Sequence, residues 1–168
     1  MPTLVSGRML SGVGGQSVGG HGAAGRVPTE FAGELLFEGG ASAGFYCSFL
    51  AEHQQWANIG GTKGFVHVRD FVLPFYGCEA AYDVTQAQFE VRGCQFNMND
   101  HTQRQAASEY SNNAPDAQET RLFRNFAALA LGGKPDPSWG EIALQTQQVL
   151  DACLKSSRLD GALVEIER

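Results

Sequence analysis

The sequence predicts an α+β fold: an open, mostly antiparallel β-sheet with helices packed on one face and the other face available for oligomerisation. Apolar and polar residues alternate through much of the chain before Asn112, and a helical repeat follows. Strands first and helices afterwards are typical of α+β proteins rather than of doubly wound sheets. The 168 residues predict a single domain over 1–168, with a Gly-rich loop at 11–26.

The first strands are predicted from alternation and turn residues. A short strand is expected from Pro2 to Leu10. Residues 31–37 and 41–50 then alternate around Gly39-Gly40, which supplies the positive φ angles of a tight hairpin turn. A second pair is expected over 57–59 and 64–70, joined by residues 60–63 and ended by Pro74.

Between Tyr82 and Arg92 the apolar residues change parity, which a bulge near Thr85-Gln86 would explain. This region is therefore expected to form one bulged strand.

Two helices are predicted after Asn112-Asn113. In the first, Pro115 is expected in the first turn and Gly132-Gly133 ends the helix. Its apolar stripe consists of Leu122, Phe123, Phe126, Leu129 and Ala130. The second helix is expected to open with the capping box Ser138-x-x-Glu141. Asp160-Gly161 then leads into a short terminal strand over 162–166.

Composition argues against nucleic-acid and membrane partners. Hydrophobic residues make up 43% of the chain, enough to bury a core. The 18 acidic residues outnumber the 12 basic ones, whereas binding a phosphate backbone requires clustered Lys and Arg. No apolar run approaches the ~20 residues of a membrane helix. The first residues do not resemble a signal peptide, and the four cysteines form no C-x-x-C pair, so we expect a cytoplasmic protein with reduced thiols.

Two motifs in the Gly-rich loop match known fingerprints without their structural context. Residues Gly20 to Gly25 satisfy G-x-G-x-x-G, but a Gly-rich loop precedes them and Val27-Pro28 follows instead of a helix. Residues Gly15 to Gly19 satisfy G-x-S-x-G, again without a strand–turn–helix. We therefore predict no cofactor-binding residues in this loop.

No catalytic or metal-ligating residues are predicted. The four histidines lack the spacing of a metal site, and Glu34, Glu38 and Glu90 lie on strand faces where solvation explains them. Four aromatic residues flank strand ends, where pockets are often built: Trp56, Phe71, Phe75 and Tyr76. They are the candidates for a substrate pocket, although packing in a core or a dimer is the simpler explanation.

Several segments are nevertheless familiar. They are Cys47-Ser48-Phe49-Leu50, the run IGGTKGFVHV at 59–68, the run DFVLPF at 70–75, Glu119 with Phe123 and Phe126, the run GKPD at 133–136 and the stretches 141–147 and 149–152. Together they resemble the C-terminal domain of the glucose-fructose oxidoreductase and inositol dehydrogenase (Gfo/Idh/MocA) family, from roughly Thr3 to the end.

The resemblance implies a two-domain parent. Its first domain would be a Rossmann domain that binds NAD or NADP, and its second an α+β domain whose open sheet shapes the substrate pocket and mediates oligomers. The catalytic lysine of the family lies in an E-K-P motif of the first domain, and its Asp/His pair precedes the first sheet strand; neither matches a position here. Met1 is therefore expected to be an internal methionine of a longer parent, and the chain alone is expected to hold no cofactor.

Three functions remain open. The leading hypothesis is a substrate-binding and oligomerisation domain of an NAD(P)-dependent oxidoreductase of a sugar- or polyol-like substrate, inactive alone. A second is a self-associating structural or binding module with no enzymatic role, pairing through Phe45, Cys47 or Tyr46 of an open sheet face. A third is the C-terminal domain of an NAD-dependent glycosidase of the same family. A homodimer through the open face is the expected oligomer.

Overall fold

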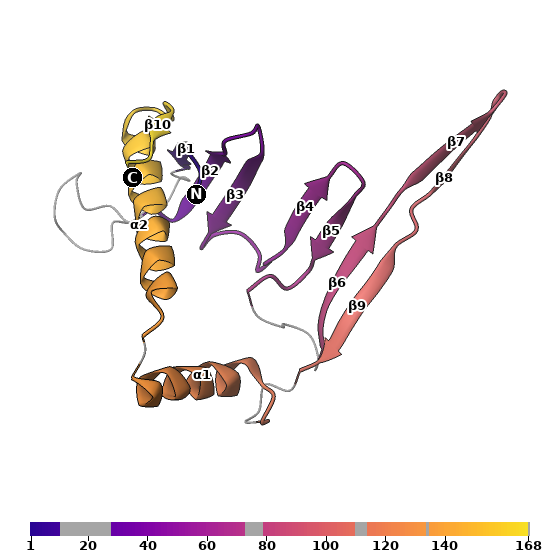
Figure 1. Ribbon diagram of the computed structural model, residues 1–168. Helices are drawn as coiled ribbons and strands as arrows, with labels where there is room; N and C mark the ends of the chain where they lie inside the picture. The colour runs from indigo at the N-terminus through magenta and orange to yellow at the C-terminus, as the bar shows by residue number, and fades with distance from the viewer. Residues whose placement is uncertain (11–27, 73–78, 110–113, 134, 168) are drawn as a thin grey trace. The chain divides into compact units, whose positions relative to one another are not determined.

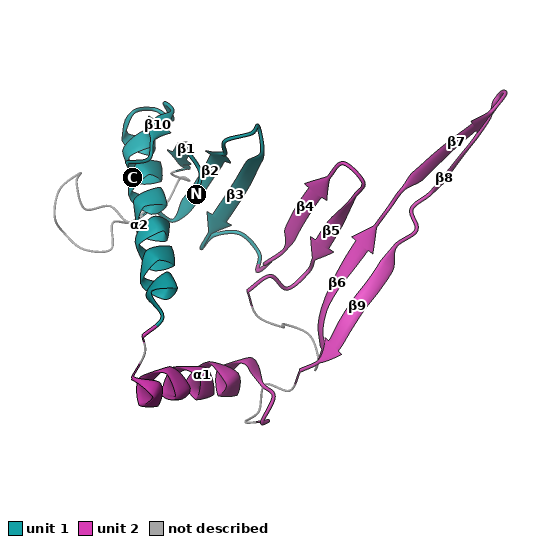
Figure 2. Ribbon diagram, viewed as in Figure 1, with its two compact units in different colours: residues 1–52, 136–168 teal, residues 53–135 magenta. Residues whose placement is uncertain are grey.

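A computed structural model describes residues 1–10, 28–72, 79–109, 114–133 and 135–167 (Figure 1). It confirms the predicted class, because ten strands form antiparallel sheets and two helices follow nine of them in the chain. The strands belong to three sheets rather than one. The chain divides into two compact units, unit 1 with residues 1–52 and 136–168 and unit 2 with residues 53–135 (Figure 2).

Unit 1 is a four-stranded antiparallel sheet with one helix. Its strands are β1 (Leu4–Met9), β2 (Glu30–Leu36), β3 (Ser42–Ser48) and β10 (Val164–Glu165), in the order β10-β1-β2-β3. The helix α2 (Pro137–Arg158) packs against β1. The predicted hairpin between β2 and β3 is confirmed, since Gly39 and Gly40 have φ angles of 88° and 86°.

The core of unit 1 lies between the sheet and α2. Its buried members are Val5, Phe31, Ala152, Cys153, Val164 and Ile166. Gly7 permits this close approach, because a Cβ atom there would lie 2.6 Å from Phe31 Cζ and 2.8 Å from the carbonyl oxygen of Cys153. Helix and sheet therefore pack closely at a position where only glycine fits.

The strand register fixes which residues of β3 face the helix. Phe31 pairs with Cys47 and Gly33 with Phe45, so Phe45 and Cys47 share the face of the buried Phe31. The Phe45 ring stacks on that of Phe31 with centroids 6.0 Å apart. Tyr46 points to the opposite face. Of the three residues expected on the open face, only Tyr46 lies there.

Unit 2 contains a four-stranded sheet, a two-stranded sheet and a helix. The larger sheet has the order β4-β5-β6-β9, with β4 (Ala57–Gly61), β5 (Gly64–Val68), β6 (Glu79–Thr85) and β9 (Gln103–Ser108). The smaller sheet pairs β7 (Gln88–Arg92) with β8 (Gln95–Asn99). The helix is α1 (Gln118–Gly132).

The predicted strand pair after residue 57 is present with different ends. Gly60 and Gly61 belong to β4, so the turn consists of Thr62 and Lys63. Strand β5 ends at Val68, because Asp70 forms a parallel bridge to Gln55 and leaves the antiparallel ladder. Pro74, the predicted end, lies outside the described residues.

The change of parity between Tyr82 and Arg92 marks a break between two strands, so the prediction of one bulged strand is wrong. Strand β6 pairs with β9, whereas β7 pairs with β8. Residues 86–87 on one side and 100–102 on the other separate the two ladders. The sequence reasoning also missed β8 and β9.

Two details of the helix starts differ from prediction. Pro115 precedes Gln118, the first residue of α1, and so lies outside the first turn. The N-cap of α2 is Asp136 rather than Ser138: Asp136 Oδ1 accepts a hydrogen bond from the Ser138 backbone N–H at 3.0 Å. Pro137 takes the first helical position, which its fixed φ favours.

Of the two described helices, neither is long and apolar enough to cross a membrane.

Candidate functional site

A row of polar side chains crosses one face of the larger sheet of unit 2. Asn58 pairs with His67, His67 with Asp83, and Asp83 with Arg104. Directly opposed residues of antiparallel strands point to the same face, so the four side chains line up across β4, β5, β6 and β9. His67 Nδ1 and Asn58 Oδ1 are 2.5 Å apart and share a hydrogen bond. The register of the four strands alone brings these residues together.

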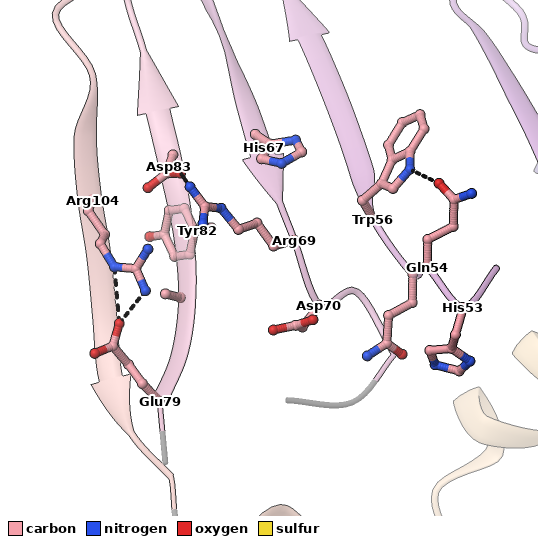
Figure 3. A pocket seen from close by; sticks show the side chains of 12 residues that line it. His53, Gln54, Trp56, His67, Arg69, Asp70, Glu79, Tyr82, Asp83 and Arg104 are labelled. Carbon is pink, nitrogen blue, oxygen red and sulfur yellow. Dashed lines mark hydrogen bonds and ion pairs between the residues drawn. The ribbon is translucent and has the colours of Figure 1, made fainter. Parts of the chain in front are cut away.

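Two arginines on this face each approach a carboxylate. Arg104 donates from Nε at 3.0 Å and from Nη2 at 2.5 Å to Glu79 Oε1. This hydrogen bond, and then the negative charge of Glu79, raises the pKa of Arg104, so its guanidinium stays charged. Arg69 Nη2 lies 3.9 Å from Asp83 Oδ2, a longer ion pair with no hydrogen bond (Figure 3). Each pair leaves donor and acceptor positions free for a ligand.

A shallow cavity of about 340 Å³ is lined by both arginine–carboxylate pairs and by Trp56. Figure 3 shows the Trp56 indole on one side and the Arg104–Glu79 pair on the other. The indole Nε1 donates to Gln54 Oε1 at 2.8 Å. Asp70 lies between the two sides, close to the strand ends (Figure 3). An aromatic surface in the same cavity as charged donors and acceptors suits a small polar ligand with an apolar face.

Only one predicted aromatic candidate contributes to this cavity among the described residues. Trp56 lines it, whereas Phe71 is exposed and lies outside it. The backbone N–H of Phe71 donates to the Gln55 carbonyl oxygen at 2.6 Å. Phe75 and Tyr76 lie outside the described residues, as do the two glycine motifs of the Gly-rich loop.

Sequence reasoning missed the polar lining, which includes His67, Asp83 and Arg104. His67 and Asp83 alternate with apolar neighbours as solvated strand residues would, whereas Arg104 lies between two glutamines, and only the pairing of distant strands brings the three together. One signal was available, since His67 and Arg69 alternate with Val66 and Val68 in a predicted strand.

The described lining of the cavity does not form a metal centre. Within the described part of the chain, no group of three His, Cys, Asp or Glu residues is arranged to hold a metal ion. The arrangement offers hydrogen bonds and charge to a bound molecule. No protein-family model matches the chain.

Proposed function

We propose that this chain is the substrate-binding and oligomerisation domain of a cytoplasmic NAD(P)-dependent oxidoreductase that acts on a sugar- or polyol-like substrate. The observation that carries the proposal is the cavity that Trp56 lines together with His67, Asp83 and Arg104 of the polar row. The segments that resemble the Gfo/Idh/MocA family, such as residues 59–68, support the same function.

The chemistry of the lining matches a polyhydroxylated molecule. Sugar hydroxyls both donate and accept, so they can bond to carboxylates such as Asp70 and to guanidinium N–H groups such as those of Arg104. Hydrogen bonds to charged groups are stronger than those between neutral groups. The apolar C–H face of a sugar ring can lie against the Trp56 indole. Because the cavity is shallow and open, we expect binding by this chain alone to be weak, with a dissociation constant of about 1 mM.

The redox step would belong to the parent enzyme. Hydride transfer requires a nicotinamide held against the substrate by a dedicated fold. The proposal therefore assigns binding and positioning of substrate to this chain and expects no turnover from it alone.

Titration of the chain with myo-inositol or glucose, followed by the indole N–H signals in NMR, tests the proposal. The chain has two tryptophans, and Trp139 belongs to α2 of unit 1. We expect a saturable shift of the Trp56 signal and none of the Trp139 signal. Arg104→Gln should weaken binding between about tenfold and a hundredfold, because a hydrogen bond to a charged group contributes about 1.5–3 kcal/mol.

Trp139→Phe is the matched control, since it assigns the signals and leaves the cavity unchanged. Equal shifts of both indole signals, or no shift at Trp56 with either compound, would refute a polyol site at this cavity.

A second candidate, a self-associating module with no enzymatic role, is favoured by one observation. Large apolar side chains remain exposed on the two-stranded sheet of unit 2, among them Phe89 and Phe96. This candidate predicts self-association without any polyol-dependent shift of Trp56.

A further inference from the structure

The hairpin of β7 and β8 has one apolar face and one polar face. In its register Phe89 pairs with Met98 and Val91 with Phe96, and these four side chains share one face. The opposite face holds the remaining pairs: Gln88 with Asn99, Glu90 with Asn97, and Arg92 with Gln95. The separation is complete, since no charged or polar side chain interrupts the apolar face.

The apolar face is uncovered in the described chain. Val91 is 62% exposed and Phe96 is 74% exposed, with the other two members between these values. The Phe89 and Phe96 rings contact each other on this face, with centroids 6.1 Å apart. A two-stranded hairpin is marginally stable in water without a surface to pack against. Burial of its apolar face would therefore stabilise this strand pair.

We propose that this apolar face is a dimer interface and that its occupant is the same face of a second copy of the chain. The inference deepens the oligomerisation role of the proposed function and rests on it. A self-complementary patch closes by two-fold symmetry, and an uncharged patch does so without desolvating a charge. Glu90 and Arg92 lie on the polar face, where their ion pair at 3.4 Å can stay in water.

The area agrees with a dimer. With large apolar side chains of about 200 Å² each, the exposed fractions leave about 500 Å² on one copy. Complete mutual burial of the two faces would remove about 1,000 Å² from water, which is the lower limit for a specific interface. This corresponds to a reversible dimer rather than an obligate one.

The sheet face of unit 1 opposite α2 is a poorer surface for the same purpose. It carries Arg8, Glu30 and Glu34, and the Tyr46 hydroxyl is already engaged with Glu30 Oε1 at 2.7 Å. Pairing two copies there would desolvate these charged side chains, and that cost opposes association.

Sedimentation velocity of the full chain across the micromolar range tests the interface. The variant Phe89→Thr/Phe96→Thr keeps residues with high strand propensity and removes both rings. The control Gln95→Thr/Asn97→Thr changes the polar face of the same hairpin. We expect the unmodified chain and the control to dimerise. The Phe variant should have a dimer dissociation constant raised about tenfold or more.

Each outcome of this experiment either supports the hairpin interface or contradicts it. If the Phe variant loses its strand signal in far-UV circular dichroism, Val91→Thr alone replaces it, with the same expected direction. A dimer that survives these changes but dissociates with Tyr46→Ser would overturn the surface assignment and leave the oligomerisation role intact. If the unmodified chain remains monomeric, both the surface assignment and the oligomerisation role are overturned. The polyol titration at Trp56 tests the binding role separately.

Discussion

The Ser156 hydroxyl bridges β1 and the segment before β10, where no backbone pair forms, and its removal should destabilise unit 1. Strand β1 pairs with β10 at Leu4 with Glu165 and at Val5 with Val164. Continuing that register would place Ala162 opposite Gly7. Instead, the fully buried Ser156 hydroxyl stands between them, accepting from the Gly7 N–H at 3.0 Å and donating to the Ala162 carbonyl oxygen at 2.5 Å.

The cost of Ser156→Ala follows from the burial of these partners. Ala162 is exposed, so water can satisfy its carbonyl group, but Gly7 is buried and its N–H would be left unpaired. An unsatisfied buried donor costs about 1–3 kcal/mol in addition to the lost hydrogen bond of about 1 kcal/mol. We expect the free energy of unfolding to fall by about 2–4 kcal/mol.

Urea denaturation followed by Trp139 fluorescence, in a Trp56→Phe background, measures this loss in unit 1. With a slope of about 2 kcal/mol/M, the midpoint should fall by about 1 M or more. The neighbouring Ser157→Ala is the matched control, because Ser157 is half-buried and its hydroxyl donates to the Leu154 carbonyl oxygen within the same helix. Equal midpoints for the two variants would refute the role assigned to Ser156.

Three further predictions concern unit 1. Gly7→Ala should lower the free energy of unfolding by about 1–3 kcal/mol through overpacking, whereas Gly44→Ala, with no atom closer than 3.9 Å to the new Cβ, should leave the urea midpoint unchanged. Hydrogen bonds from the Ser138 side chain and backbone lower the pKa of Asp136, so its stabilisation is present above the unfolded pKa near 3.9 and is lost as pH falls through the folded pKa. In acid titrations by circular dichroism, Asp136→Asn should therefore show a weaker loss of stability below about pH 4, and an unchanged profile would contradict this. Burial raises the pKa of Cys153, so this thiol should react with Ellman's reagent only slowly, and Cys153→Ser should keep the fast phase of the exposed cysteines.

The features predicted correctly are those that neighbouring residues determine. Gly39 and Gly40 supply positive φ angles whatever the rest of the chain does, and Gly133 ends α1 in the left-handed conformation with φ of 61°. The alternation of Phe31 and Leu35 likewise placed both toward the core. Local stereochemistry is sufficient for these elements.

The start of α2 shows two local signals in competition. Ser138 with Glu141 satisfies the capping-box pattern, and Asp136 followed by Pro137 satisfies another cap pattern two residues earlier. Proline cannot donate a backbone hydrogen bond, which is no loss at the first helical position. The earlier start therefore adds two residues to the helix, and the Ser138 hydroxyl becomes a donor to Asp136 Oδ1 at 2.7 Å.

The candidate site could not be predicted in the same way, because pairing of distant strands creates it. Asp83 and Arg104 are opposed only because β6 pairs with β9, and the sequence of β9 contains no apolar alternation that would identify a strand. Trp56 was recognised from its size and its place at a strand end, whereas His67 and Arg104 resembled ordinary solvated residues. Polar sites on sheets are therefore harder to predict than the apolar strands that support them.

The break at Gln86-Ala87 explains how polar and apolar surfaces coexist in one continuous stretch of unit 2. Before the break, odd-numbered residues of β6 such as Asp83 belong to the polar row, whereas after it the odd-numbered Phe89 and Val91 form the apolar face of the hairpin. In a single uninterrupted strand, residues of one parity share one face, so these two surfaces would merge and the apolar side chains would adjoin the polar row. Because β6 pairs with β9 and β7 pairs with β8, the polar row and the apolar face stay separate. The parity change, read from the sequence as a bulge, is thus the point at which the polar row ends and the apolar face of the hairpin begins.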